Sequence, residues 1–438
     1  MGDVTVGIDI GTSSVKAVAA DGDGNVVARS RIPHSFRVPT PTRFEHDADV
    51  AWRQGPQLAL AALGDVDPVG VSVAAMVPSL AAVGVDGRPV TPGLLYGDDR
   101  GRHGSTGGNP AESGELLAFL RWAAAEAPGA HGYWPAQAVA NHALGGEPFL
   151  DTTTAATAYP LFDWKGWDET LAAEVGVATA QLPKLAPTGL ACGRVGGDGP
   201  ALAPGCIDAF AEQLVAGADD DGDVLVLLGT TLIVWAVVPG EVHVPDHYVI
   251  PHSAPGKMLA GGPSNAGGLF LNWATSMLTD VEPAADPGSV PLWAPYPRGE
   301  RVPYNDPDRR AVLAGLDLTH GAGAVRRAAF EASGFVVRRM LDAVPVESRR
   351  IVATGGGIRV NEWVQALADC TGMPVDCVAV PEGGALGSAW LARIAAGLED
   401  PAAMTEARRW ARTGRTVEPD GRWVAPTAAR YERWTELA

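Results

Sequence analysis

Two distant segments of this 438-residue chain share one pattern, in which an apolar strand runs into a Gly-Thr-hydroxyl turn and a second apolar strand follows. The first copy covers residues 4–18 and turns at Gly11, and the second covers residues 224–235 and turns at Gly229. Apolar strand patterns on both sides of a short polar turn predict a β-hairpin. The repeat therefore predicts two related domains, each built around such a hairpin.

The first turn carries the groups that a polyphosphate and a metal ion need. Gly11 lets the backbone turn tightly, and Thr12 and Ser13 add hydroxyl and N–H donors for phosphate oxygens. Asp9 can hold Mg²⁺ directly or through water. The glycine spacings of the P-loop and of the dinucleotide-binding fingerprint are absent, so phosphate is expected on the hairpin turn itself. Taken alone, this copy is also compatible with an ordinary hairpin that has a polar turn.

The second turn, Gly229, Thr230 and Thr231, repeats the glycine and the hydroxyls. When the two turns are aligned, Leu227 takes the place of Asp9, so only the first copy keeps a carboxylate. The pair of turns predicts that two domains clamp the phosphates of a nucleotide and that one of them holds the metal ion.

The length of the chain predicts two domains of roughly 200 residues each. An acidic, glycine-containing run at residues 218–223 directly precedes the second hairpin pattern. Its position between the two copies favours a domain boundary, which gives domains at 1–218 and 219–438, although a solvated loop would have the same composition.

The composition excludes several classes of function. A formal net charge of −18 argues against binding nucleic acid or an anionic membrane through a broad basic face. We find no apolar run of the ~18 residues that a membrane helix needs and no targeting pattern at the N-terminus, so a cytoplasmic location is expected. Buried free thiols, rather than disulfides or zinc ligands, are expected for Cys192, Cys206, Cys370 and Cys377.

Asp208 is the candidate proton acceptor. It follows a Pro-Gly loop and stands at the predicted start of a helix with apolar spacing from Phe210 to Leu214. An aspartate at such a position is commonly a helix cap. Its place just before the predicted domain boundary also allows it to face a cleft and accept a proton from a substrate hydroxyl.

A triple glycine follows a short buried-strand pattern at residues 351–353. Gly355, Gly356 and Gly357 would allow a planar group such as adenine to approach the backbone closely, although such a turn can also be a plain connection. The sequence predicts a helix after it, capped by Asn361.

Mixed charges at another predicted strand end suggest a sugar site. Asp98 and Arg100 follow Tyr96, and this arrangement suits hydrogen bonds to several sugar hydroxyls or, equally, a salt-bridged surface turn. His46 and Trp52 belong to an earlier polar and aromatic segment that can border the same site.

Taken together, these motifs resemble those of the FGGY carbohydrate kinases, members of the actin-like ATPase superfamily, from about residue 4 to about residue 398. The matching segments, in chain order, are the first phosphate turn (9–16), the sugar-side motif (Tyr96, Asp98 and Arg100), the base segment (205–208), the second phosphate turn (229–231), a C-terminal signature (297–301 with 315–334) and the adenosine segment (355–357).

The resemblance implies an α/β protein with two RNase-H-like domains, an active-site cleft between them, and ATP and Mg²⁺ as cofactors. In this reading Asp208 removes the proton from the attacking hydroxyl, Asp9 positions Mg²⁺ and Lys16 faces the phosphates, which suits a reaction that depends on alignment and electrostatics. The implied nucleotide-binding residues are Gly11, Thr12, Ser13, Lys16, Gly229, Thr230, Thr231, Gly355, Gly356, Gly357 and Asn361. The implied substrate-binding residues are Met76, Val77, Tyr96, Asp98, Arg100 and Asp208.

Two departures bear on the substrate. Many xylulokinases have a Met-His pair where this chain has Met76 and Val77, and Tyr96 replaces the tryptophan usual in the sugar-side motif. A ketopentose such as xylulose is the leading expectation, with gluconate, another ketose or a polyol as alternatives. A catalytically weak, nucleotide-dependent sugar sensor is a second class, and a chaperone-like or cytoskeletal ATPase is disfavoured by the sugar-side motif. Whether the chain forms a homodimer stays open.

Overall fold

In the computed structural model, which describes residues 3–40, 42–101, 115–240, 242–254, 256–278, 282, 284 and 286–437, the chain forms two compact units. Unit 1 comprises Met1–Val215 and Glu382–Trp410, and unit 2 comprises Ala216–Pro381 and Ala411–Ala438. Because Glu382–Trp410 belongs to the first unit, the chain does not divide into the consecutive segments 1–218 and 219–438. The acidic run at 218–223 lies within unit 2, where the buried Asp223 is held by Arg350 (2.8 Å).

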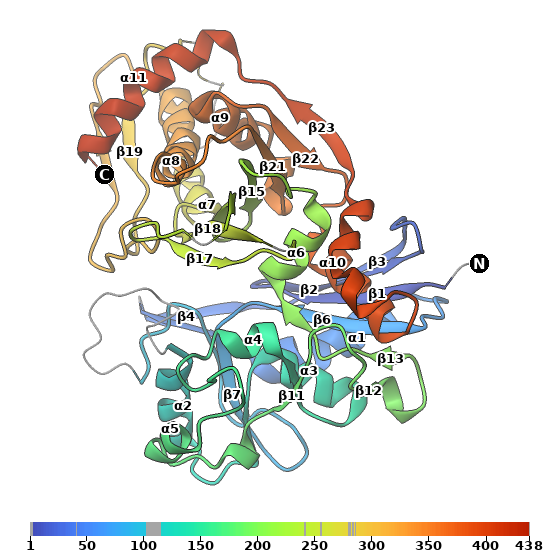
Figure 1. The fold of residues 1–438 in the computed structure, drawn as a ribbon. Coiled ribbons are helices and arrows are strands. Elements are labelled where there is room, and N and C mark those ends of the chain that lie inside the picture. The colour runs from blue at the N-terminus through green and yellow to red at the C-terminus, as the bar shows by residue number, and fades with distance from the viewer. Residues whose placement is uncertain are drawn as a thin grey trace. The chain divides into compact units, whose positions relative to one another are not determined.

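Unit 1 is built on a mixed sheet with the strand order β12-β13-β6-β1-β2-β3, in which β14 also pairs with β6 (Figure 1). Its strands are β1 (Thr5–Ile10), β2 (Ser14–Ala20), β3 (Val26–Pro33), β6 (Gly70–Ala75), β12 (Gly193–Arg194), β13 (Ala201–Leu202) and β14 (Cys206–Ile207). A second sheet contains β4 (Phe36–Thr40), β5 (Arg43–His46), β7 (Ser79–Val83), β8 (Gly93–Leu95) and β9 (Gly132–Trp134), and a small third one contains β10 (Phe149–Asp151) and β11 (Lys184–Ala186).

The α-helices described in unit 1 are α1 (Gly55–Ala61), α2 (Glu115–Glu126), α3 (Ala136–Gly145), α4 (Thr152–Ala156), α5 (Glu169–Glu174), α6 (Asp208–Ala216, which ends at the unit boundary) and α10 (Gly383–Ala395). The shorter or irregular helical turns are η1 (Asp49–Gln54), η2 (Thr179–Gln181), η3 (Val195–Gly197) and η5 (Pro401–Trp410).

Alternation along β1 assigns its two faces. Val6, Ile8 and Ile10 belong to a buried cluster that includes residues of α1 and α3. The opposite face carries Gly7, where a Cβ atom would lie only 1.8 Å from the carbonyl oxygen of Ala385 in α10. Helix α10 therefore packs backbone to backbone on β1, and its orange-red ribbon accordingly lies among blue strands in Figure 1. This contact explains why a late segment of the chain joins the first unit.

Unit 2 has a sheet with the order β17-β18-β16-β15-β21-β22-β23. Its strands are β15 (Asp223–Leu228), β16 (Leu232–Pro239), β17 (Tyr248–Pro251), β18 (Lys257–Ser264), β21 (Arg350–Thr354), β22 (Val375–Val378) and β23 (Thr413–Val417), with a separate pair β19 (Leu292–Ala294) and β20 (Val312–Ala314). Its helices are α7 (Gly268–Ser276), α8 (Ala322–Asp342), η4 (Gly356–Arg359), α9 (Asn361–Thr371) and α11 (Gly421–Leu437).

The structure confirms the predicted repeat. Strand β1 pairs antiparallel with β2 and parallel with β6, and β15 pairs in the same two ways with β16 and β21. The prediction of free thiols is also confirmed: three of the four cysteines are buried and Cys192 is half-buried. Within the described ranges, no helix is both long enough and apolar enough to cross a membrane.

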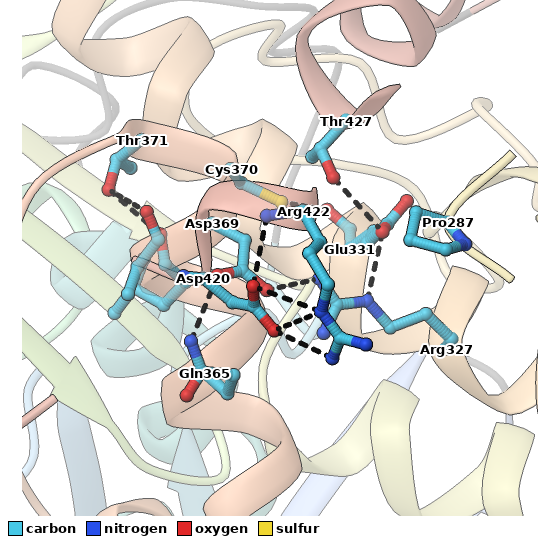
Figure 2. Close-up of polar contacts among 12 residues, drawn as sticks. Pro287, Arg327, Glu331, Gln365, Asp369, Cys370, Thr371, Asp420, Arg422 and Thr427 are labelled. Carbon is cyan, nitrogen blue, oxygen red and sulfur yellow. Dashed lines mark hydrogen bonds and ion pairs between the residues drawn. The ribbon is translucent and has the colours of Figure 1, made fainter. Parts of the chain in front are cut away.

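A buried network of charges ties α8, α9 and α11 of unit 2 together (Figure 2). Glu331 accepts hydrogen bonds from Arg430 (2.7 Å) and forms an ion pair with Arg327 (2.9 Å). Arg327 also pairs with Asp369 (2.7 Å), and both acidic residues are only 1% exposed. Each buried charge in the network is paired with an opposite charge. Removing one residue would therefore leave its partners as buried charges that are no longer fully compensated.

We expect Glu331→Ala to lower the free energy of unfolding of unit 2 by about 3–5 kcal/mol, because it leaves two arginines buried without their shared carboxylate. The matched control is Arg422→Ala, which removes the exposed pair of Arg422 with Asp420 seen in the same view and should cost at most about 1 kcal/mol. Urea unfolding monitored by tryptophan fluorescence measures both, and equal losses would contradict the assigned role of the network.

Candidate active site

The first of the two predicted phosphate turns closes tightly, as the backbone N–H of Gly11 donates to the carbonyl of Ser14 (3.1 Å). Asp9 and Lys16 are register partners across this hairpin, and Lys16 Nζ lies 3.2 Å from Asp9 Oδ2. The Asp9 carboxylate, opposed by partial burial, raises the pKa of Lys16. The turn therefore presents a permanent positive charge beside its carboxylate.

The N-terminus of α10 lies against Asp9. A Cβ atom on Gly384, in the first turn of this helix, would be 3.2 Å from Asp9 Cγ. The partial positive charge at a helix N-terminus attracts a nearby anion, and Asp9 places a carboxylate there. The small residues at the start of α10 thus serve close packing in this unit.

Asp208 shares one edge of the sheet with Asp9. Strands β1 and β14 flank β6 in parallel, with Asp9 and Cys206 both in register with Ala74, and Asp208 follows two residues after Cys206 as the first residue of α6. Parallel strands end at the same edge, which brings the two carboxylates together. The predicted position of Asp208 at the start of a helix is confirmed.

The environment of Asp208 disfavours its ionised form. The side chain is half-buried, and its Oδ1 accepts a hydrogen bond from the backbone N–H of Ala209 (2.7 Å). Burial first, and then the negative charge of Asp9, raise the pKa of Asp208 to about 6. Such a carboxyl exchanges a proton near neutral pH, as a general base requires. Met76 and Val77 follow the end of β6, the strand between the two carboxylates.

The carboxylates suit a magnesium ion that is held partly by substrate. In the part of the chain that the structure describes, no group of three or more His, Cys, Asp or Glu residues could hold a metal ion. Mg²⁺, however, keeps most of its waters and binds through one or two carboxylates plus substrate phosphates. Asp9 fits this mode, and metal binding at this residue stays a prediction.

His46 and Trp52, which lie outside the glycine-hydroxyl motif, support the first turn through hydrogen bonds. His46 Nε2 donates to the carbonyl oxygen of Thr12 (2.8 Å), and Trp52 Nε1 donates to His46 Nδ1 (3.0 Å). Because the carbonyl can only accept, this chain of bonds fixes a neutral histidine protonated on Nε2. Burial, followed by neighbouring His34, lowers the pKa of His46 to about 4. The segment that was expected to border a sugar thus supports the phosphate turn.

The sugar-side motif is bonded within unit 1. Tyr96 and Thr12 share a hydrogen bond between their hydroxyls (3.2 Å), which links the motif to the phosphate turn. Asp98 is fully buried, and Arg100 pairs with both Asp98 (2.6 Å) and Glu45 (2.8 Å). These ion pairs match the salt-bridged alternative, and direct contact of Asp98 or Arg100 with a sugar stays a prediction.

The second phosphate turn lies against the start of α7 in unit 2. The backbone N–H groups of Gly268 and Leu269 donate to the carbonyls of Gly229 (2.8 Å) and Thr230 (3.1 Å). A Cβ atom on Gly267 would lie 2.3 Å from the backbone nitrogen of Leu232, so the segment must be glycine to come this close. Thr230 is exposed and Thr231 is half-buried.

The three glycines after β21 differ in role. Gly355 has φ +85°, and a Cβ atom on Gly357 would lie 2.4 Å from the ring of Trp363. Gly356 is exposed, with nothing within 4 Å of its Cβ position, so it is the open one of the three. The predicted cap by Asn361 is wrong: Val360 is the N-cap of α9, and Asn361 Oδ1 accepts a hydrogen bond from Arg415 (2.8 Å).

Two family models match consecutive parts of the chain. The N-terminal domain model of the FGGY family of carbohydrate kinases matches residues 4–199, and the C-terminal domain model matches residues 228–396. The chain belongs to the FGGY family of carbohydrate kinases. As a family member, it is an ATP-dependent phosphotransferase that acts on an alcohol group of a carbohydrate.

Relatives in the family align over nearly the whole chain. Xylulose kinase of Klebsiella pneumoniae is 28% identical, covering 99% of this chain and 98% of its own, and xylulose kinase of Escherichia coli (strain K12) is 27% identical, covering 90% of each. Gluconate kinase from Lactobacillus acidophilus matches in structure with a TM-score of 0.80 at 21% identity, covering 99% of this chain and 97% of that one. The predicted fold class, α/β with two domains of the actin-like ATPase type, is confirmed. The cleft between the domains stays a prediction.

We expect His46 to remain neutral and protonated on Nε2 between pH 5 and pH 8, because its pKa is about 4 and both ring nitrogens are engaged. NMR of ¹⁵N-histidine-labelled protein, with His46→Gln to assign the signals, measures the tautomer and any titration. A signal that titrates within this range, or an Nδ1-protonated ring, would contradict the assignment.

Proposed function

We propose that this FGGY kinase transfers the γ-phosphate of ATP to a hydroxyl of a ketopentose such as xylulose. The proposal of a ketopentose is supported by the two xylulose kinases, at 27% and 28% identity, that align with at least nine-tenths of the chain. The observation that carries the catalytic assignment is the pair of Asp9 and Asp208 at one edge of the unit 1 sheet, where Asp208 has a pKa of about 6.

In the proposed mechanism Asp208 accepts the proton of the attacking sugar hydroxyl. Its raised pKa makes it a stronger base than an ordinary aspartate while leaving it largely ionised at pH 7. Lys16 remains protonated and offers its charge to phosphate oxygens. Mg²⁺, when bound at Asp9, would neutralise charge on the phosphates.

The two glycine-hydroxyl turns are proposed to hold the ATP phosphates, and Gly356 the adenosine. Backbone N–H groups and hydroxyls at residues 11–13 and 229–231 can donate to phosphate oxygens without adding bulk. Because phosphoryl transfer depends mainly on positioning and electrostatics, such preorganised donors are what the reaction needs.

Kinase activity on gluconate, another ketose or a polyol is the runner-up. The sugar-side departures at Val77 and Tyr96 leave the substrate open, and the fold is shared with a gluconate kinase. A nucleotide-dependent sugar sensor without useful turnover is less well supported. A sensor has no need of a carboxyl whose pKa is raised towards neutrality beside a second carboxylate.

We expect a coupled ADP-release assay over ketoses, polyols and sugar acids to single out a ketopentose. With that substrate, Asp208→Ala should lower kcat by about 100-fold or more, as loss of a general base does. The matched control is Asp198→Ala, which removes an exposed aspartate of the same unit and should leave kcat unchanged.

A strong signal only with gluconate or a polyol would replace the ketopentose by that substrate. Unchanged turnover by Asp208→Ala would refute the catalytic assignment. Sugar-dependent nucleotide binding without ADP release from any compound would favour the sensor. The thermal unfolding midpoint of each variant must stay near that of the wild type for these comparisons to hold.

The rate should also depend on pH in a defined direction. Below its pKa Asp208 is protonated and cannot accept a proton, so kcat/KM for the sugar should fall about tenfold per pH unit below an acid limb at pH 6 or slightly lower. A cation bound beside the carboxyl would lower the pKa of Asp208, so any difference from pH 6 should move the acid limb to lower pH. Rates measured from pH 4.5 to 8.5 at constant ionic strength test this, and a flat profile or a limb above pH 7 would contradict it.

A further inference from the structure

Glu300 is a buried acid that the proposed mechanism does not use. Only 3% of it is exposed, and it lies on the segment 298–302 of unit 2. Its Oε2 accepts a hydrogen bond from Ser264 Oγ (2.7 Å), and its Oε1 accepts from the backbone N–H groups of Asn265 (2.8 Å) and Arg301 (2.6 Å). Glu300 therefore fastens its own segment to the turn between β18 and α7, the turn that leads into the helix on which the second phosphate turn rests.

The neighbouring Arg301 reaches the second phosphate turn itself. Its guanidinium donates to Thr231 Oγ1 (3.3 Å) and to the carbonyl oxygen of Ser264 (3.5 Å). Ser264 is the register partner of Leu232, the residue directly after Thr231. The backbone at Arg301 is fixed by Glu300, and the side chain of Arg301 is thereby aimed at the hydroxyl of the turn.

Comparison of the two hairpins shows that the second one lacks the cationic side chain of the first. When Gly11 is aligned with Gly229, Lys16 of the first hairpin aligns with Val234, which is fully buried. The second hairpin, residues 223–239, contains no lysine or arginine. The first hairpin carries a positive charge, Lys16, on its own strand. At the second turn a positive charge must come from another segment, and Arg301 supplies it.

We propose that Arg301 is a phosphate-contacting residue of the second turn and that Glu300 is the residue that positions it. A guanidinium presents several N–H groups in one plane and binds phosphate oxygens in pairs, which suits this place beside a Gly-Thr-Thr turn. The inference rests on the proposed function only in placing nucleotide phosphates at residues 229–231. The buried Glu300 is stabilised by three donors, so its loss would release the segment rather than a single bond.

Binding of ATP and of adenosine, measured separately by titration calorimetry without sugar, tests the proposal. Arg301→Ala should weaken ATP binding by about 10- to 100-fold, the range for a lost charged hydrogen bond, and change adenosine binding less than about threefold. Arg301→Lys should recover part of the loss, since it keeps the charge but not the paired donors. The matched control, Arg310→Ala, removes an exposed arginine whose hydrogen bonds, among the described residues, go to the carbonyls of Pro307 and Arg309 in its own segment, and it should change neither affinity.

The positioning role of Glu300 needs its own variants. Glu300→Gln keeps an oxygen acceptor for the two backbone N–H groups and should stay within about threefold of the wild type, whereas Glu300→Leu should lose ATP affinity selectively, as Arg301→Ala does. In an Arg301→Ala background Glu300→Leu should add little, because it acts through Arg301. If Glu300→Leu does not fold, Ser264→Ala, which removes one donor to Glu300, should show a smaller loss of the same selectivity.

Equal losses of ATP and adenosine affinity would assign Arg301 a purely structural role and overturn the proposal, as would an unchanged ATP affinity in Arg301→Ala. Unchanged selectivity in the folded Glu300 and Ser264 variants would overturn the positioning role alone. The proposed function fails separately: a wild type that binds ATP but phosphorylates no sugar refutes the kinase substrate assignment, whatever Arg301→Ala does. Conversely, if the wild type phosphorylates a ketopentose and Arg301→Ala binds ATP normally, only the role of Arg301 is refuted.

Discussion

Direct backbone contact between α10 and β1 is the constraint on which the unit 1 site depends. The helix can come so close to β1 because Gly7 on the strand leaves no Cβ atom in the way. Gly387 of α10 plays the same part towards α6, since a Cβ atom on Gly387 would lie 1.8 Å from the carbonyl oxygen of Ala211. One helix therefore holds β1, α6 and the surroundings of Asp9 in fixed positions. Asp208 at the start of α6 gains its relation to Asp9 from this packing as well as from the strand register.

The two hairpins show how one topology supports two chemistries. Ala74 on β6 pairs with Asp9, and Thr354 on β21 pairs with Leu227, the residue that aligns with Asp9. The segments that follow, Met76 with Val77 in one unit and the three glycines in the other, are thus equivalent in topology. Substrate contacts are proposed for the first and adenosine contacts for the second. The carboxylate of Asp9 is in unit 1, where a metal ion is proposed to bind, and the three glycines are in unit 2, where adenosine is proposed to bind.

Local patterns predicted the parts of this structure that local forces decide. Hairpin strands and the helix that begins at Asp208 follow from apolar spacing and turn chemistry, which neighbouring residues determine. The return of α10 to unit 1, the support of Thr12 by His46, and the reach of Arg301 to Thr231 depend on contacts between residues far apart in the chain. The helix cap failed for a related reason, because Arg415, far along the chain, engages Asn361. No periodicity in the sequence records such contacts.

Asp208 can both begin a helix and accept a proton, so the two interpretations of its sequence position are compatible. An aspartate that begins a helix meets the positive end of the helix dipole and a backbone donor, and both lower the pKa of a carboxyl. Here the donor is present at Ala209, yet burial and the charge of Asp9 outweigh it and the pKa rises to about 6. A cap on an exposed helix has no such opposing effects. The same residue therefore begins the helix and, through the strand end and the carboxylate beside it, acquires the basicity that the proposed proton transfer requires.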